Sequence, residues 1–136
     1  MLVFDRPPST YDYAIVRVVP RVERGEFVNV GVILSCSATG FLEARVELDD
    51  AAVVALHALA PSLDLDQIRN SLAAIPVLCA GGPAAGAMGA LSLRERFHWL
   101  VAPRSSSVQT SPVHTGRCDD LRSALDAVFD RMVRRG

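Results

Sequence analysis

The polar side chains best placed for chemistry lie near the start of the chain, inside a run that is otherwise apolar. Arg17 interrupts the stretch YDYAIVRVVP, and Glu26 and Asn29 follow shortly after it. A charged side chain is tolerated in such a strand only where water or a partner satisfies it, and Glu26 is close enough in sequence to pair with Arg17. These three residues could therefore hold an anion or position a partner molecule, or they could tie a hairpin together by hydrogen bonds.

A second group of polar residues combines cations, one aromatic ring and small hydroxyl groups. Such residue types suit contacts with phosphate or with single-stranded nucleic acid. The chain has a single Trp, so it has no evident stacking platform, and the alternative is an exposed helix face with Trp99 buried. We retain Arg104 and Gln109 as candidate binding residues. The full group is Arg94, Arg96, His98, Trp99, Arg104 and the segment 105–109.

Patterns for catalysis and metal binding are weak in this sequence. A nucleophile needs a neighbouring base, and although Ser106, His114 and Cys118 could meet, none of them lies in a strand–turn–helix motif. The three cysteines are far apart, and no two His lie at helical ligand spacing. The glycine-rich segment 80–89 lacks the Lys-Ser/Thr pair of a phosphate loop. We therefore predict no catalytic residue, no metal and no cofactor.

The composition describes one apolar folded domain, which we expect to span residues 1–136. Half of the residues are hydrophobic and 21% are charged, so some apolar surface could remain for an interface. The net charge is −1, and no overall field would attract the chain to nucleic acid or to an anionic membrane. Nucleic acid and membrane are therefore not the expected partners.

The expected location is the cytoplasm. The first residues, MLVFDRPPSTYDY, carry an acid and two prolines where a signal peptide needs a basic start and an apolar run. Residues 71–93 carry no charge over a length that could cross a bilayer. Because Ala, Gly and Pro dominate this segment, we interpret it as a helix end, stopped or kinked at Pro76, followed by a flexible loop.

Hydrophobic periodicity predicts the elements that must position these residues. Runs rich in β-branched residues at 11–20, 27–36 and 41–48 predict three strands, and 108–116 predicts a fourth that Pro112 would confine to a sheet edge. Apolar stripes behind capping residues predict helices over 51–60, 65–75, 93–102 and 121–133. The predicted fold is α+β, an antiparallel sheet of three to four strands with about four helices packed mainly on one face and an amphipathic C-terminal helix.

The first two strands are expected to form a hairpin that places the polar residues on one face. Pairing Val19 with Phe27 sets Arg17 opposite Asn29 and Ile15 opposite Gly31. In this register the apolar residues of the two strands share the core face. The other face is then a polar patch, which also carries two charged residues of the third strand. The residues expected on the core face are Ala14, Val16, Val18, Val28, Val30, Val32 and Leu34, and those expected on the polar face are Tyr13, Arg17, Asn29, Gly31, Glu43 and Arg45.

The run YDYAIVRVVPRVERGEFVNVGVIL resembles the N-terminal signature of the domain-of-unknown-function 3037 family. A second block, from RFHWLVAPRSSSVQTSPVHTG to the final FDRMV, is also similar, so the likeness covers nearly the whole chain. The resemblance implies a bacterial protein often encoded beside a HipA-like serine/threonine kinase, by association only. The matching positions in the first block are Tyr13, Arg17, Pro20, Glu26, Asn29, Gly31 and Val32.

The leading interpretation is a non-enzymatic interaction or regulatory module, partnered with a HipA-like kinase in a toxin–antitoxin or regulatory unit. The alternative is a small nucleic-acid-processing enzyme or anion-binding domain that uses Arg17, Glu26 and Asn29 with Arg104 and His114. Steeply salt-dependent binding to nucleic acid, or metal-dependent turnover, would favour the alternative. The candidate binding surface under either hypothesis is Arg17, Glu26, Asn29, Arg104 and Gln109.

Overall fold

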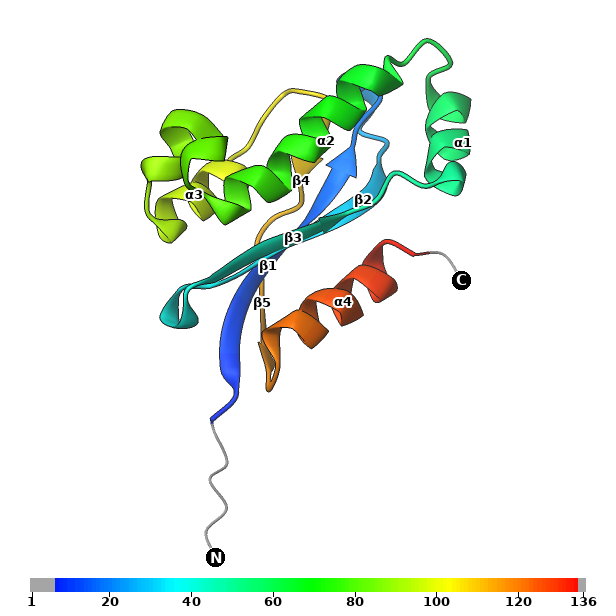
Figure 1. Ribbon diagram of the computed structural model, residues 1–136. Helices are drawn as coiled ribbons and strands as arrows, with labels where there is room; N and C mark the ends of the chain where they lie inside the picture. Colours follow the sequence, from blue (N-terminus) through cyan, green and yellow to red (C-terminus); the bar gives the residue numbers. More distant parts are fainter. Residues whose placement is uncertain (1–6, 135–136) are drawn as a thin grey trace, which may run out of the picture.

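The computed structural model describes residues 7–134, which form a five-stranded antiparallel sheet between two layers of helices (Figure 1). The strand order is β3-β2-β1-β4, and β5 also pairs with β1. This confirms the α+β class. The strands are β1 (Ser9–Val18), β2 (Val28–Cys36), β3 (Phe41–Val46), β4 (Val108–Thr110) and β5 (His114–Cys118). The helices are α1 (Asp50–Leu59), α2 (Leu65–Ala80), α3 (Leu93–Leu100) and α4 (Leu121–Met132), and the short 3-10 segments are η1 (Val22–Arg24), η2 (Ser37–Thr39) and η3 (Pro83–Ala90).

The sheet has one strand more than the upper expected number because Pro112 divides the last predicted strand into β4 and β5. Both halves pair with β1. At the break, Ser111 replaces the missing ladder bonds: its N–H donates to the Ile15 carbonyl at 2.8 Å, and its buried hydroxyl accepts from the Ile15 N–H at 2.9 Å. A side chain therefore holds the strand where the proline interrupts it.

The predicted register of the first hairpin is right at one end and wrong at the other. Arg17 lies opposite Asn29 as expected, but Ile15 pairs with Val32 and not with Gly31. A register shift between Val16 and Arg17 causes the difference, because an extra residue in one strand reverses the faces beyond it. The alternating run of β2 is consequently divided between the two faces of the sheet. Val28 and Val30 lie in one core, and Val32 and Leu34 lie in the other.

One face of the sheet is covered by α1, α2 and α3 (Figure 1). The helices bury Leu56, Leu72 and Phe97 against the strands. The sequence predicted that Pro76 stops or kinks α2; the helix does not stop at Pro76 and continues to Ala80. Burial of Ile75 and Cys79 on either side of Pro76 favours continuation, and Arg96 donates to two carbonyls of the last turn, as described below.

The opposite face, predicted to be a polar patch, is covered by α4 (Figure 1). The helix buries Leu125, Val128 and Phe129 against Ile15 and Val32. The alternating charges of β3 were interpreted as a wet face because their partners are distant in sequence. In the structure they pair with residues of α4: Arg122–Glu43 at 2.6 Å and Arg45–Asp126 at 3.0 Å. Arg134, just after α4, also pairs with Glu47, just after β3, at 3.3 Å.

Among the described residues, no single helix has both the length and the apolar character needed to cross a membrane. The uncharged segment that raised this question forms the end of α2 and then η3. These two helices reach the necessary length only together, and they are bent by 65° relative to each other.

Candidate functional site

Three of the predicted site residues form a row across neighbouring strands. Gln109 of β4 lies opposite Arg17 of β1, and Arg17 lies opposite Asn29 of β2. Directly opposite residues of an antiparallel sheet point to the same face. The Asn29 side chain donates to the Met132 carbonyl at 3.1 Å, so this row lies at the C-terminal end of α4. Arg17 and Gln109 are 92 positions apart in the sequence, and the pairing of β4 with β1 brings them together.

The expected ion pair between Arg17 and Glu26 is absent from this row. Glu26 binds Arg24 at 2.8 Å instead, because Gly25, with φ of 73°, ends η1 and keeps Glu26 beside that turn. The Arg17 guanidinium lies over the Phe27 ring, 3.9 Å from its centroid. Burial lowers the pKa of Arg17 from its ordinary value. The Nε of Arg17 and the Oδ1 of Asn29 are buried and have no hydrogen-bond partner among residues 7–134.

The second predicted group separates into structural and exposed residues. Arg96 is structural: its Nε donates to the Leu78 carbonyl at 3.0 Å, and its two terminal nitrogens donate to Leu91 at 2.6 Å and Cys79 at 3.3 Å. A helix leaves its last carbonyls without intrahelical partners, and a cation satisfies them well. Arg96 therefore fastens the end of α2 to the start of α3.

Arg94, His98 and Trp99 are exposed, and the half-buried Arg104 packs on Trp99. The Arg104 guanidinium donates to the carbonyls of Trp99 at 2.6 Å and Leu100 at 3.2 Å, and it lies 4.3 Å from the centroid of the Trp99 ring. The favoured interpretation of this group, an exposed helix face with Trp99 buried, is wrong about Trp99, since 46% of it is exposed. Phe97 and Leu100 take the inward positions of α3, so His98 and Trp99 between them are turned outward.

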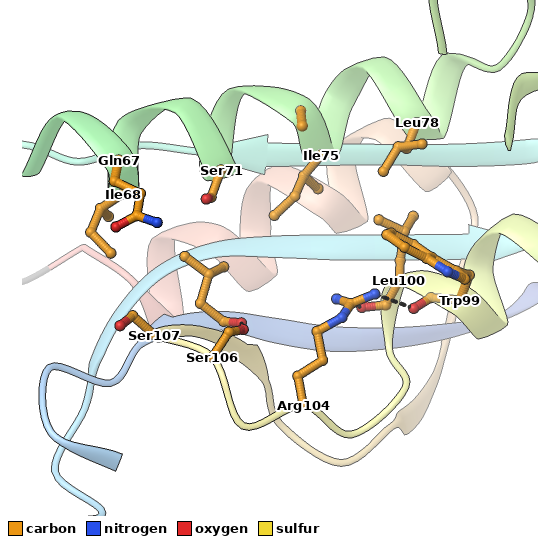
Figure 2. Close-up of a pocket in the computed structure, with 12 residues that line it drawn as sticks. Gln67, Ile68, Ser71, Ile75, Leu78, Trp99, Leu100, Arg104, Ser106 and Ser107 are labelled. Atoms are coloured by element: carbon orange, nitrogen blue, oxygen red, sulfur yellow. Dashed lines mark hydrogen bonds between the residues drawn. The ribbon is translucent and has the colours of Figure 1, made fainter. Parts of the chain in front are cut away.

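Trp99 and Arg104 border a groove between α2 and the segment after α3 (Figure 2). The groove has a volume of about 320 Å³. Apolar side chains form much of its lining, and none of its lining residues is Asp or Glu. Figure 2 shows α2 side chains pointing toward Arg104 and the serines of the opposite wall. The lining residues are Gln67, Ile68, Ser71, Ala74, Ile75, Leu78, Trp99, Leu100, Arg104, Ser106, Ser107 and Val108.

The Arg17 row therefore lies on the face of the sheet covered by α4, and the groove beside Trp99 lies on the opposite face, covered by α2 and α3. Gln109, which was grouped with Arg104, joins the Arg17 row instead, and its side chain donates to the Ser106 carbonyl at 2.8 Å. Sequence reasoning missed the contribution of α2, where Gln67 and Ser71 stand one helical turn apart beside the apolar stripe. That spacing was the available signal.

The groups considered for nucleophilic catalysis do not meet in a reactive arrangement. The Ser106 hydroxyl donates to the Val108 carbonyl at 2.9 Å, and His114 packs against Tyr13 with ring centroids 5.4 Å apart. Burial is the main cause that raises the pKa of the Cys118 thiol from its ordinary value, which disfavours the thiolate. Residues 7–134 contain no group of three or more His, Cys, Asp or Glu that could hold a metal ion.

Comparison with known proteins gives one match. A family model described as a protein of unknown function, DUF3037, matches residues 13–133. No curated protein and no solved structure matches the chain.

Proposed function

The chain belongs to the DUF3037 family, whose function is unknown, and from this premise we propose that it is a non-enzymatic module that binds a protein partner through the groove beside Trp99. The single observation that carries this proposal is the pairing of Trp99 and Arg104 at the groove. Trp and Arg are among the residue types that dominate the binding energy of protein interfaces, and here the two are stacked at the border of a groove.

The lining of the groove suggests the chemistry of the partner. Arg104 donates to backbone carbonyls only, so no carboxylate of the lining balances its charge. Ser71, Ser106 and Gln67 add hydrogen-bonding groups above an apolar floor. The complementary partner segment has an apolar side chain for the floor and an acidic side chain for Arg104.

The proposed partner is a HipA-like serine/threonine kinase, and the proposed role is its regulation. The support is the family resemblance described from the sequence, together with a groove suited to a protein segment.

Calorimetric titration of such a kinase, encoded beside the gene for this chain, tests the proposal. We expect Trp99→Ala to weaken binding at least about tenfold, because a central aromatic contact is lost. Phe27→Ala is the matched control, since Phe27 is 45% exposed and also lies under an arginine. Equal affinities of the wild type and Trp99→Ala would remove the groove from the interface.

A further inference from the structure

The two edges of the sheet differ in how their backbone groups are covered. At the β4 edge, Ser106 donates to the Val108 carbonyl and Gln109 donates to the Ser106 carbonyl. At the other edge, β3 pairs with β2 on one side, and no strand within residues 7–134 pairs with its outer side. An edge strand with free N–H and C=O groups is a template for a further strand.

The register shows which groups of β3 are free. The Glu47 N–H donates to the carbonyl of Val30, its directly opposite residue, at 2.7 Å. Because bonded residues alternate along an antiparallel ladder, Glu43 and Arg45 also turn their backbone toward β2. The backbone groups of the three alternate residues, Leu42, Ala44 and Val46, therefore face the open edge.

The sequence of β3 is self-complementary about Ala44. In an antiparallel pair related by a two-fold axis at this residue, Ala44 lies opposite Ala44 of a second copy. Glu43 then lies opposite Arg45 of the second copy, and Leu42 lies opposite Val46. Opposite charges directly across a strand pair favour this alignment. If the second copy shifted by one position, Glu43 would no longer lie opposite Arg45.

The space beside the edge also matches a second strand. Two hollows of about 460 Å³ and about 320 Å³ lie between β3 and α2, one on each side of Ala44 along the strand. Both are bordered by Pro76. Residues 42 and 46 of a second copy would point into them, on the side of the sheet that carries α2. The apolar residues bordering the hollows include Leu42, Val46, Leu48, Leu72, Ala73, Cys79 and Leu93.

We propose that the chain forms a two-fold symmetric dimer in which β3 pairs with β3 of a second copy. The two sheets then form one continuous ten-stranded sheet, and the contact closes because both copies use the same surface. This proposal is independent of the groove beside Trp99, which lies between α2 and β4 at the other edge.

Sedimentation equilibrium of the wild type and of Ala44→Pro tests the dimer. Proline is tolerated on an edge strand where the N–H faces outward, so Ala44→Pro should leave the β2–β3 ladder intact. It removes two symmetry-related hydrogen bonds and should raise the dissociation constant of the dimer at least about tenfold. Thr110→Pro is the matched control, because the bonds of Ser107 and Ser111 to β1 indicate that the Thr110 N–H also faces outward.

The proposal expects a dimeric wild type, a dimeric Thr110→Pro and a largely monomeric Ala44→Pro with unchanged circular dichroism. The proposal would be overturned if the wild type is monomeric at every concentration from roughly 1 mM down to a 100-fold dilution. It would also be overturned if the wild type is a dimer that Ala44→Pro does not weaken. If Ala44→Pro unfolds, amide exchange of the wild type decides. Protection of Leu42, Ala44 and Val46 should rise with protein concentration, and concentration-independent exchange would contradict the dimer.

Discussion

Two of the arginine–aromatic pairs have aromatic rings of nearly equal exposure but lie in different surroundings. Phe27 is 45% exposed under Arg17, and Trp99 is 46% exposed under Arg104. Arg17 belongs to a polar row at the end of α4, on a face that this helix covers. Arg104 instead borders a groove of about 320 Å³ on the face covered by α2 and α3.

The comparison shows that residue types alone do not define a binding surface. Both pairs satisfy the same local preference for a cation over a ring. Only the arrangement of helices places one pair beside α4 and the other beside a groove. We therefore assign the α4 face to stability and the Trp99 groove to recognition, and each assignment can be tested separately.

Phe129→Ala should give the largest effect. Phe129 is fully buried at the centre of the α4 face, with Arg45 stacked on its ring at 4.3 Å. Removing a buried Phe costs about 3–5 kcal/mol of unfolding free energy. Urea denaturation measures the loss, and Phe27→Ala serves as a control. A cost below about 1 kcal/mol for Phe129→Ala would contradict the structural role of the α4 face.

Ser111→Ala should have an intermediate effect, because the Ile15 N–H loses the hydroxyl that accepts it inside the sheet. A buried donor without a partner costs about 1–3 kcal/mol. The same denaturation assay measures this cost, with exposed Ser105→Ala as the control. If the two serine variants are equally stable, the hydroxyl does not replace a ladder bond as described.

Cys79, in the core beneath α2 and α3, should show the smallest effect at neutral pH and a specific effect on stability at alkaline pH. Burial raises the pKa of Cys79 to about 12, from 9.0. Above about pH 9 the unfolded thiol loses its proton while the folded thiol keeps it. The folded state then binds more protons, so stability falls as the pH rises toward 12, with a slope of up to about 1.4 kcal/mol per pH unit.

Denaturation of the wild type and Cys79→Ala across this alkaline range measures the contribution of the thiol. The variant should show a shallower decline. Parallel curves would mean that Cys79 ionises as readily in the folded state as in the unfolded one.

The sequence was sufficient for the first three strands and the four α-helices because their patterns are local, but it did not predict the division of the last strand into β4 and β5 or the formation of η3. Ser92 and Glu95 form the capping box expected at the start of α3, and the stripe of α4 packs on the sheet. The pairing of Arg17 with Asn29 also followed from the hairpin. The register shift beyond Val16 could not be predicted, since it depends on how the strand accommodates an extra residue between two cores.

The candidate site was less predictable because its residues meet through distant contacts. Glu43 and Arg45 have the alternation of an exposed strand face, and only the complementary charges of α4 explain their position. Gln109 joined the Arg17 row through the pairing of β4 with β1. The contribution of α2 to the groove could not be predicted, because the sequence does not show which helix faces the segment after α3.

Photo-crosslinking in the native host tests the assignment of the groove most directly. A photoreactive phenylalanine analogue is placed at position 99, or at position 27 as the matched control. The account predicts one crosslinked protein at position 99 that excess wild-type chain displaces and excess Trp99→Ala chain does not. Crosslinking confined to position 27, or competition by both chains equally, would contradict it.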